Sequence, residues 1–212
     1  MRMWNLFCCV FVAGCLALLP SAVLAESWCG AIPGHGKDYI TNKKALDVVE
    51  RYHFTNDVRM LRRGASGYIA NDLDYVLNHF PNHHAALDAF SRLAIREGTS
   101  KPTHAQWNIE CRFYWARTVN SNDAMVPFIQ GLHHYRQGKM GQAREYLEQS
   151  VNLNPDNPEV LYNLGVILVK LGDHEEARLH AQAAYAMGHP LPGLRNMLER
   201  AGYPLSATEA QD

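Results

Sequence analysis

Apolar side chains recur at steps of three and four residues through most of the chain, and this spacing predicts an all-α protein. In the N-terminal half the pattern marks helices over about 43–52, 56–64, 68–80 and 82–98. The polar segment TSKPTH follows at 99–104, and a further helix is predicted over 104–119. Asn42, Thr55 and Thr103 are the expected N-caps of three of these helices, because their side chains can accept a backbone hydrogen bond.

From residue 124 to residue 191 the pattern repeats with a period of 34 residues. Three small residues recur at this spacing, as the pairs Gly131 and Gly165, Gly138 and Gly172, and Ala143 and Ala177. Each unit is predicted to form a helix, a tight turn and a second helix. Gly131 and Gly165 lie in the first helix, where the absence of a side chain lets the second helix approach closely. Gly138 and Gly172 follow that helix at a position that usually requires a positive φ.

Proline and asparagine mark the boundary between the two units. Pro155 ends one helix, because a proline disfavours helical backbone angles in the residue before it. Asn157 can then cap the next helix, and Pro158 fits its first turn, where a backbone N–H has no partner within the helix. Pro127 is tolerated in the first unit only if its helix begins near Ala124, so that the proline falls in the first turn.

The glycines, alanines and prolines at these spacings resemble those of the tetratricopeptide repeat family. The resemblance implies a right-handed α-solenoid of helix-turn-helix repeats. Repeats are expected at 124–157 and 158–191, a C-terminal capping helix at 192–203 and a tail at 204–212. Residues 42–123 are predicted to form degenerate repeats, because the spacing of 17 residues from Gly64 to Pro81 equals that from Gly138 to Pro155.

The resemblance is imperfect at four positions. Pro127, Gln130 and His134 stand where the family prefers large apolar residues, and His189 stands where its closing proline falls. We therefore expect a different, terminal helix after His189, because a stacked array needs a cap over its last apolar surface. The apolar stripe predicted for that helix consists of Leu191, Leu194, Met197 and Leu198.

Residues 1–25 have the pattern of a secretory signal peptide. Arg2 is followed by an uncharged apolar run of 14 residues at 6–19, and a small-residue cleavage site ends at Ala25. The sequence therefore predicts export to the periplasm or secretion, without a membrane span after cleavage. An alternative is open, because residues 12–15 (VAGC) resemble a bacterial lipobox, in which Cys15 would carry the lipid.

Cleavage after Ala25 would remove three of the five cysteines and leave Cys29 and Cys111. An even pair in an oxidising compartment predicts a Cys29–Cys111 disulfide. Such a bridge would pin the arm at 26–41, rich in glycine and proline, onto a helix. Two unpaired thiols remain the alternative.

Charge and candidate chemistry narrow the function further. The chain carries 20 basic and 21 acidic residues, and removing Arg2 with the leader leaves 19 and 21, so its net charge changes from −1 to about −2. Without a basic block, nucleic-acid binding has little support.

The 11 histidines include no pair four residues apart within an unbroken helix, which argues against a metal site. No cofactor is expected. Asp72 and Asp74 are interpreted as favourable charges near a helix N-terminus.

The family resemblance, carried over by position, implies a concave groove lined by the first helices of the two repeats. Its predicted residues are Met125, Phe128, Leu132, Tyr135, Arg136, Glu159, Tyr162, Val166, Val169 and Lys170. The groove would be apolar and aromatic, with Arg136 and Lys170 as cations. For several of these residues, especially Leu132 and Val166, a place in the core between repeats is the alternative.

The repeats and the leader together suggest a non-enzymatic protein- or peptide-binding module of the bacterial cell envelope, acting as a scaffold or adaptor. The segments FPNHHAAL and PLPGLRNMLERAG also resemble exported bacterial tetratricopeptide proteins of unassigned function. Two alternatives stay open. One is an envelope enzyme or metal binder that uses residues 28–119, with Cys111 and His104 as a conceivable nucleophile pair. The other is a structural lipoprotein scaffold.

Overall fold

The computed structural model describes residues 28–205, and every regular element in that range is helical. The chain divides into two units, with the boundary between Gly30 and Ala31. The helices of the second unit are α2 (Leu46–His53), α3 (Asn56–Arg59), α4 (Ile69–His79), α5 (His84–Glu97), α6 (Ile109–Val119), α7 (Met125–Arg136), α8 (Met140–Leu153), α9 (Pro158–Leu171), α10 (His174–Ala186) and α11 (Gly193–Arg200).

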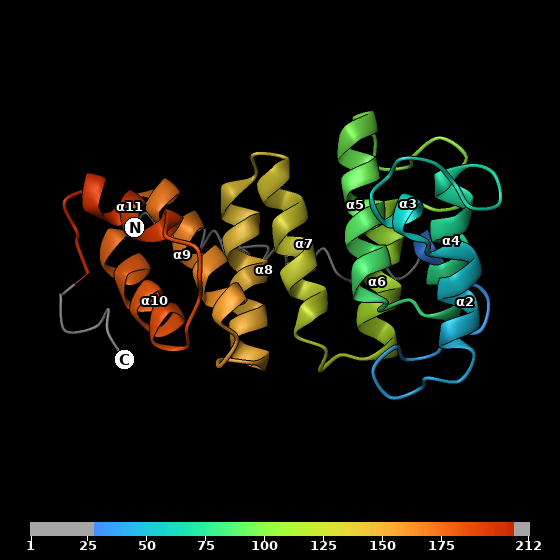
Figure 1. Cartoon of the computed structure of the whole chain (residues 1–212), viewed down its shortest axis with the longest axis horizontal. Helices are drawn as coiled ribbons and strands as arrows, with labels where there is room; N and C mark the ends of the chain where they lie inside the picture. Colours follow the sequence, from blue (N-terminus) through green and yellow to red (C-terminus); the bar gives the residue numbers. More distant parts are fainter. Residues whose placement is uncertain (1–27, 206–212) are drawn as a thin grey trace, which may run out of the picture. The chain divides into compact units, whose positions relative to one another are not determined.

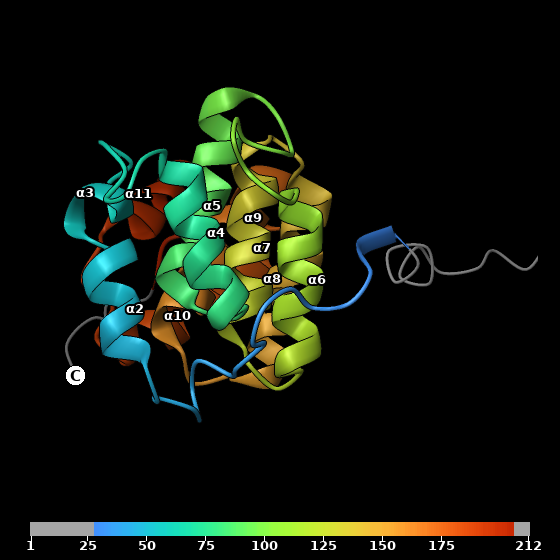
Figure 2. The ribbon, with the colours of Figure 1, turned by 90° about the vertical axis from the view of Figure 1, so that its right-hand side faces the viewer.

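The helices pack in the order in which they follow along the chain. Each of the principal helix–helix contacts joins elements one or two positions apart, from α2 with α4 to α9 with α11. Figure 1 shows α7 to α11 side by side in this order, and Figure 2 shows α2 and α3 beside α4 and α5. Contacts limited to near neighbours are the property that defines a solenoid of helical repeats. The predicted α-solenoid is therefore confirmed.

The two 34-residue units have the geometry that their small residues predict. Gly138 and Gly172 follow α7 and α9 with φ values of 75° and 91°. A Cβ atom at Gly131 would lie 2.8 Å from Cγ of Leu147 on α8. A Cβ atom at Gly165 would lie 2.5 Å from Cδ2 of Leu194 on α11. Both glycines are thus required by close packing, although the tightest contact at Gly165 is with the terminal helix.

The boundary residues also behave as predicted. The Asn157 side chain accepts hydrogen bonds from the backbone N–H groups of Glu159 and Val160, at 3.0 and 3.3 Å, and Pro158 is the first residue of α9. Pro127 is the third residue of α7, so it lies in the first turn. Local signals therefore place the ends of these helices.

The start expected for α2 and the end expected for α3 are wrong. Asn42 does not cap α2. Its side chain accepts from Lys44 N at 3.2 Å in a turn, and Ala45, in the left-handed region with φ of 67°, delays the helix to Leu46. Thr55 does cap α3, accepting from Val58 N at 3.5 Å. This helix ends at Arg59 instead of 64, before the left-handed Leu61.

The helix expected over 104–119 begins five residues later, at Ile109, with Asn108 as its N-cap. Thr103 does not cap it. The Thr103 N–H donates to Oε2 of Glu97 at 2.6 Å, and His104 adopts a φ of 66°. Residues 99–108 therefore form a loop at the end of α5, because the left-handed residue interrupts the helical backbone.

The terminal helix covers α9 and α10. Leu194 and Leu198 are fully buried, as the predicted apolar stripe requires. Leu191 was expected in the same stripe, but its side chain is 55% exposed, because it precedes α11 in an extended segment. The expectation for Leu191 is therefore wrong. Of the predicted tail, residues 206–212 lie outside the described residues.

Residues 31–41 of the N-terminal arm bind the C-terminal end of α4. The backbone N–H groups of His35 and Lys37 donate to the carbonyl oxygens of Asn78 and His79, at 3.0 and 2.9 Å. These carbonyls have no partner within the helix, so the arm satisfies them. The Asn82 side chain accepts from Tyr39 N and donates to Oδ1 of Asp38, both at 2.8 Å. The arm is thus fixed by backbone and side-chain bonds.

The two cysteines in the described part of the chain are both buried and both disulfide-bonded. This supports the predicted bridge between Cys29 and Cys111. The predicted signal peptide and the alternative lipid site at Cys15 lie outside the described residues, so these expectations stay predictions.

Candidate functional site

The predicted groove residues lie on α7 and α9, the first helices of the two repeats. Six of them are partly exposed while packing against the core, namely Met125, Leu132, Tyr135, Tyr162, Val166 and Val169. Together with the charged Arg136, Glu159 and Lys170 they form what we call the α7–α9 face. Phe128 does not belong to this face, because its side chain is only 5% exposed and lies in the core.

Contacts at both ends hold α7 and α9 together. At the start of the helices, Nδ2 of Asn157 lies 3.7 Å from Sδ of Met125. Near their ends, Nζ of Lys170 lies 5.8 Å from the centre of the Tyr135 ring. The two helices therefore run in the same direction, with their starts near each other and their ends near each other.

The three charged residues of the face differ in their partners. Nη2 of Arg136 lies 2.8 Å from Oδ1 of Asp88 on α5, and its Nη1 donates to Oγ of Ser91 at 3.3 Å. Oε2 of Glu159 lies 3.2 Å from Nε2 of His189. Lys170 has no carboxylate within 4.0 Å among the residues that the structure describes.

An aromatic cluster fixes the end of the face nearest the C-terminus. The Tyr162 ring stacks on His189, with centroids 4.0 Å apart and planes 16° from parallel. A Cβ atom on Gly193 would lie 2.6 Å from the Tyr162 hydroxyl, so the glycine leaves room for that group. The Tyr185 hydroxyl accepts from Arg195 N at 3.1 Å and donates to Leu191 O at 2.8 Å. His189, where the family has proline, is therefore a packing residue.

A comparison with protein-family models matches residues 130–192 to the tetratricopeptide repeat family. Over these residues the chain is similar to tetratricopeptide repeats. The matched segment runs from the middle of α7 to the residue before α11, and so includes most of the α7–α9 face. No curated protein matches the chain. Because such repeats generally mediate protein–protein interactions, the match indicates a protein partner.

The polar departures inside the first tetratricopeptide repeat have partners on neighbouring helices. Oε1 of Gln130 accepts from Nη1 of Arg117 on α6. The His134 ring stacks on Tyr146 of α8, with centroids 5.2 Å apart. Gln130 therefore links the repeat to α6, and His134 joins the two helices of the repeat itself.

A buried serine and histidine join α5 to α7, and the sequence analysis did not single them out. Nδ1 of His133 lies 2.9 Å from Oγ of Ser91, and Nε2 of Gln137 lies 3.0 Å from Nε2 of His133. Burial lowers the pKa of His133 to about 4, so the ring is neutral near pH 7. Because the Gln137 amide donates to Nε2, Nδ1 carries the ring proton and donates to the serine.

This serine–histidine pair lacks the arrangement of a catalytic nucleophile and base. The histidine donates its proton to Ser91 and so cannot accept the serine proton through the same nitrogen. Both side chains are also buried, with 0% and 3% exposure. The pair is therefore a structural contact between α5 and α7. No local signal could have revealed it, because its partners are 42 residues apart.

Asp72 lies in the first turn of α4, as the sequence suggested, and both Asp72 and Asp74 also have tertiary partners. Both are fully buried. Asp74 pairs with Arg112 of α6, which is itself buried, and Oδ2 of Asp74 accepts from Gln106 N at 2.5 Å. Oδ2 of Asp72 accepts from Ala65 N at 2.7 Å and fixes the loop before α4. The two carboxylates thus stabilise tertiary structure, in addition to the favourable position of Asp72 near the N-terminus of α4.

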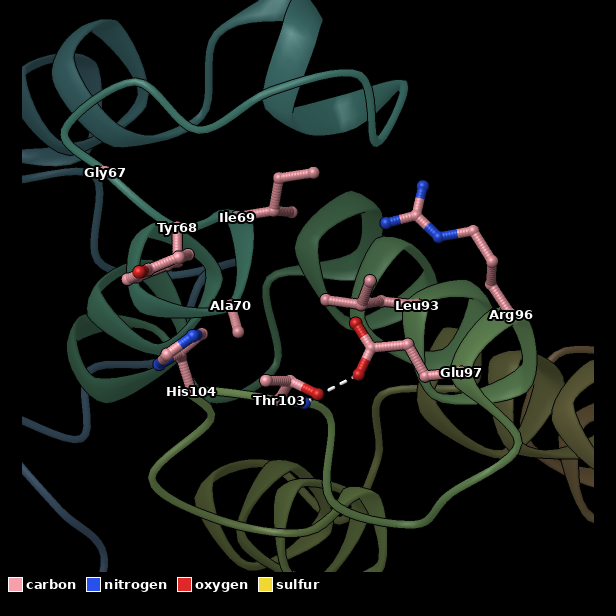
Figure 3. A pocket seen from close by; sticks show the side chains of 9 residues that line it. All are labelled: Gly67, Tyr68, Ile69, Ala70, Leu93, Arg96, Glu97, Thr103 and His104. Carbon is pink, nitrogen blue, oxygen red and sulfur yellow. Dashed lines mark hydrogen bonds between the residues drawn. The ribbon is translucent and has the colours of Figure 1, made fainter.

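The N-terminal half contains a hollow of about 340 Å³ that the sequence did not predict. Figure 3 shows the Tyr68 and His104 side chains on one side of this hollow and Arg96 and Glu97 on the other. Both charged side chains already bond to the protein backbone. Nη1 of Arg96 donates to Leu61 O at 2.7 Å, and Glu97 accepts from Thr103 N. We assign this hollow no chemical role.

Two further properties bear on the alternatives of metal binding and membrane anchoring. Within residues 28–205, no three His, Cys, Asp or Glu side chains are grouped so that they could bind a metal ion. In the same range no helix is both long and apolar enough to cross a membrane.

Proposed function

We propose that this protein is a non-enzymatic scaffold or adaptor of the bacterial cell envelope, which binds a linear segment of a partner protein on its α7–α9 face. The supporting observation is the row of six partly exposed apolar and aromatic side chains on the first helices of two consecutive tetratricopeptide repeats. A surface of this kind suits a segment that lays apolar side chains along a helical groove.

The face is suited to binding because it is apolar and held in place at the same time. Helix α8 packs against both α7 and α9 and so positions them, and contacts between Asn157 and Met125 and between Lys170 and Tyr135 bridge the two helices. The Asp88–Arg136 pair at 2.8 Å ties the face to α5. Such preorganisation lowers the entropic cost that a partner must overcome on binding.

A pair of substitutions on the face tests this function. We expect Tyr135→Ala/Val169→Ala to lose a partner that the wild-type protein captures from envelope extract under mild cross-linking. Overlapping synthetic peptides of that partner would then locate the segment by fluorescence anisotropy. Leu179→Ala is the matched control, because Leu179 is 60% exposed on α10, away from the face.

Thermal unfolding must show that both variants fold. Equal capture by the wild type and the folded double variant would contradict the proposal. So would peptides that bind both proteins with equal affinity.

Export is part of the same proposal and has a separate test. The signal-like pattern at residues 1–25 predicts a mature protein that begins at Glu26. Mass spectrometry of the protein from its native host would give that N-terminus. A diacylglyceryl group on Cys15 would favour the lipoprotein alternative, and a chain that retains Met1 and remains in the cytoplasm would refute export.

A further inference from the structure

The charges of the α7–α9 face are unevenly compensated. Asp88 neutralises only one of the two arginines that contact it, because its Oδ2 lies 2.8 Å from Arg92 and its Oδ1 lies 2.8 Å from Arg136. The face and the two α5 residues beside it therefore carry three cations, Arg92, Arg136 and Lys170, and two carboxylates, Asp88 and Glu159, which leaves a net charge of about +1. The face therefore has a positive bias.

Lys170 is the cation of the face that remains without a carboxylate in the described part of the chain. Arg136 is bonded to Asp88 and Ser91, and Glu159 is bonded to His189. The Lys170 amine lies 5.8 Å from the Tyr135 ring centre, beside the apolar side chains of the α7–α9 face. A carboxylate that reaches the amine would displace water from these side chains, and the lower local dielectric would strengthen the ion pair.

We infer that the partner segment carries the side-chain carboxylate of an aspartate or glutamate, which pairs with Lys170, next to apolar side chains that pack on Leu132, Tyr135 and Val169. This inference rests on the proposed function, since it specifies what occupies the same face. The partner is thus an acidic and apolar linear segment. Basic segments are disfavoured, because they would bring a cation against Lys170.

A library of random linear peptides, displayed without free C-termini, tests this inference. Selection on the wild-type protein is expected to enrich Asp or Glu next to large apolar residues. Selection on the Lys170→Glu variant is expected to enrich Lys or Arg at the same place. Lys44→Glu is the matched control, because Lys44 is an exposed lysine far from α9 in the sequence and the charge change is the same.

The selected acidic peptides, amidated at their C-termini, then provide affinities. Lys170→Met should weaken their binding about 3- to 10-fold and Lys170→Glu more than about 10-fold, as expected for loss and reversal of one partly desolvated charge pair. Wild-type affinity should fall as salt is raised, and the affinity of Lys170→Met should depend less on salt. Lys44→Glu should bind like the wild type.

The outcomes separate the inference from the function on which it rests. One outcome would refute the inference alone: Tyr135→Ala/Val169→Ala abolishes peptide binding, but the selected peptides are not enriched in acidic residues and Lys170→Glu binds them as well as the wild type does. The proposed function would then stand. If no peptide binds the wild-type protein, both are overturned. Enrichment of acidic residues that persists in Lys170→Glu would also refute the role of Lys170.

Discussion

At the scale of single residues, small side chains decide how closely the helices pack. We expect Gly131→Ala to destabilise the protein by about 1–3 kcal/mol, the usual cost of overpacking a core. The added Cβ would lie 2.8 Å from Cγ of Leu147 and 3.2 Å from Ala143 O, and the backbone atom cannot move as a side chain can. Urea unfolding measures the difference.

Gly141→Ala is the control for this prediction. Gly141 lies in α8, and no atom lies within 4 Å of a Cβ placed there. Alanine should therefore stabilise the helix by about 0.5–1 kcal/mol, because it costs less conformational entropy than glycine. Equal stabilisation by the two substitutions would show that close packing does not require the glycine at 131.

The buried His133 should make stability depend on pH. Its pKa is lowered from 6.5 to about 4 by burial, with smaller contributions from His134, Arg136 and Lys139. Between these pH values the unfolded chain binds a proton that the folded protein does not, so stability falls as the pH falls from 6.5 to 4. The loss from this residue should reach about 2 kcal/mol at pH 5.

Urea unfolding at pH 7 and pH 5 tests this, with His133→Gln compared with the wild type. The variant should be less sensitive to pH, although less stable at pH 7, because its partners lose a bond. Ser91→Ala is the control, since it removes the hydrogen bond but keeps the buried ring that is the main cause of the shift. An unchanged pH dependence in His133→Gln would contradict the prediction.

At the scale of elements, one asparagine fixes the start of α9. Asn157→Ala removes the acceptor of two backbone N–H groups, at 3.0 and 3.3 Å, and should cost about 1 kcal/mol. For a domain of this size the midpoint of thermal unfolding should fall by about 2–4 °C. Asn163→Ala lies inside the same helix and should have little effect or stabilise it, since alanine is the better helix former. A larger loss at Asn163 would refute the capping role.

The distance along the chain between a signal and the atoms it contacts explains which helix ends the sequence could predict. The ends of α7 and α9 were predictable because Gly138, Gly172 and Asn157 act on backbone atoms a few residues away. The start of α6 also has a local cap, because the Asn108 side chain accepts from Cys111 N at 2.8 Å, but the sequence analysis placed the start at residue 104, where nothing local marks His104 as left-handed. Propensity alone extends that helix through residues that the tertiary structure uses as a loop.

The candidate site shows the same limit. The positions of its six exposed apolar residues follow from the repeat, because the period fixes which side of each first helix faces outward. Phe128 is in the core, and Arg136 has a carboxylate partner on α5, which is 48 residues from it in sequence at Asp88. A pairing over this distance leaves no trace in local patterns. That Lys170 has no carboxylate partner within residues 28–205 therefore became visible only in the structure.

At the scale of the whole molecule, a solenoid transmits a local loss of packing mainly to its neighbours. Leu194 on α11 is fully buried against α9, close to Gly165. We expect Leu194→Ala to cost about 2–5 kcal/mol as a cavity in the core. Amide hydrogen exchange should become faster in α9, α10 and α11, and change much less in α4 and α5, which do not contact α11 among the principal helix pairs.

Glu199→Ala is the control for this last prediction, because Glu199 is exposed on the same helix and its loss leaves the packed surface intact. Exchange that accelerates equally from α4 to α11 in Leu194→Ala would mean that the array unfolds as one cooperative unit, and nearest-neighbour coupling would then be wrong. A graded response would instead place the α7–α9 face next to the least stable end of the chain. In that case, a partner bound there would slow exchange in α9 most, because binding to the folded state stabilises the helices that it contacts.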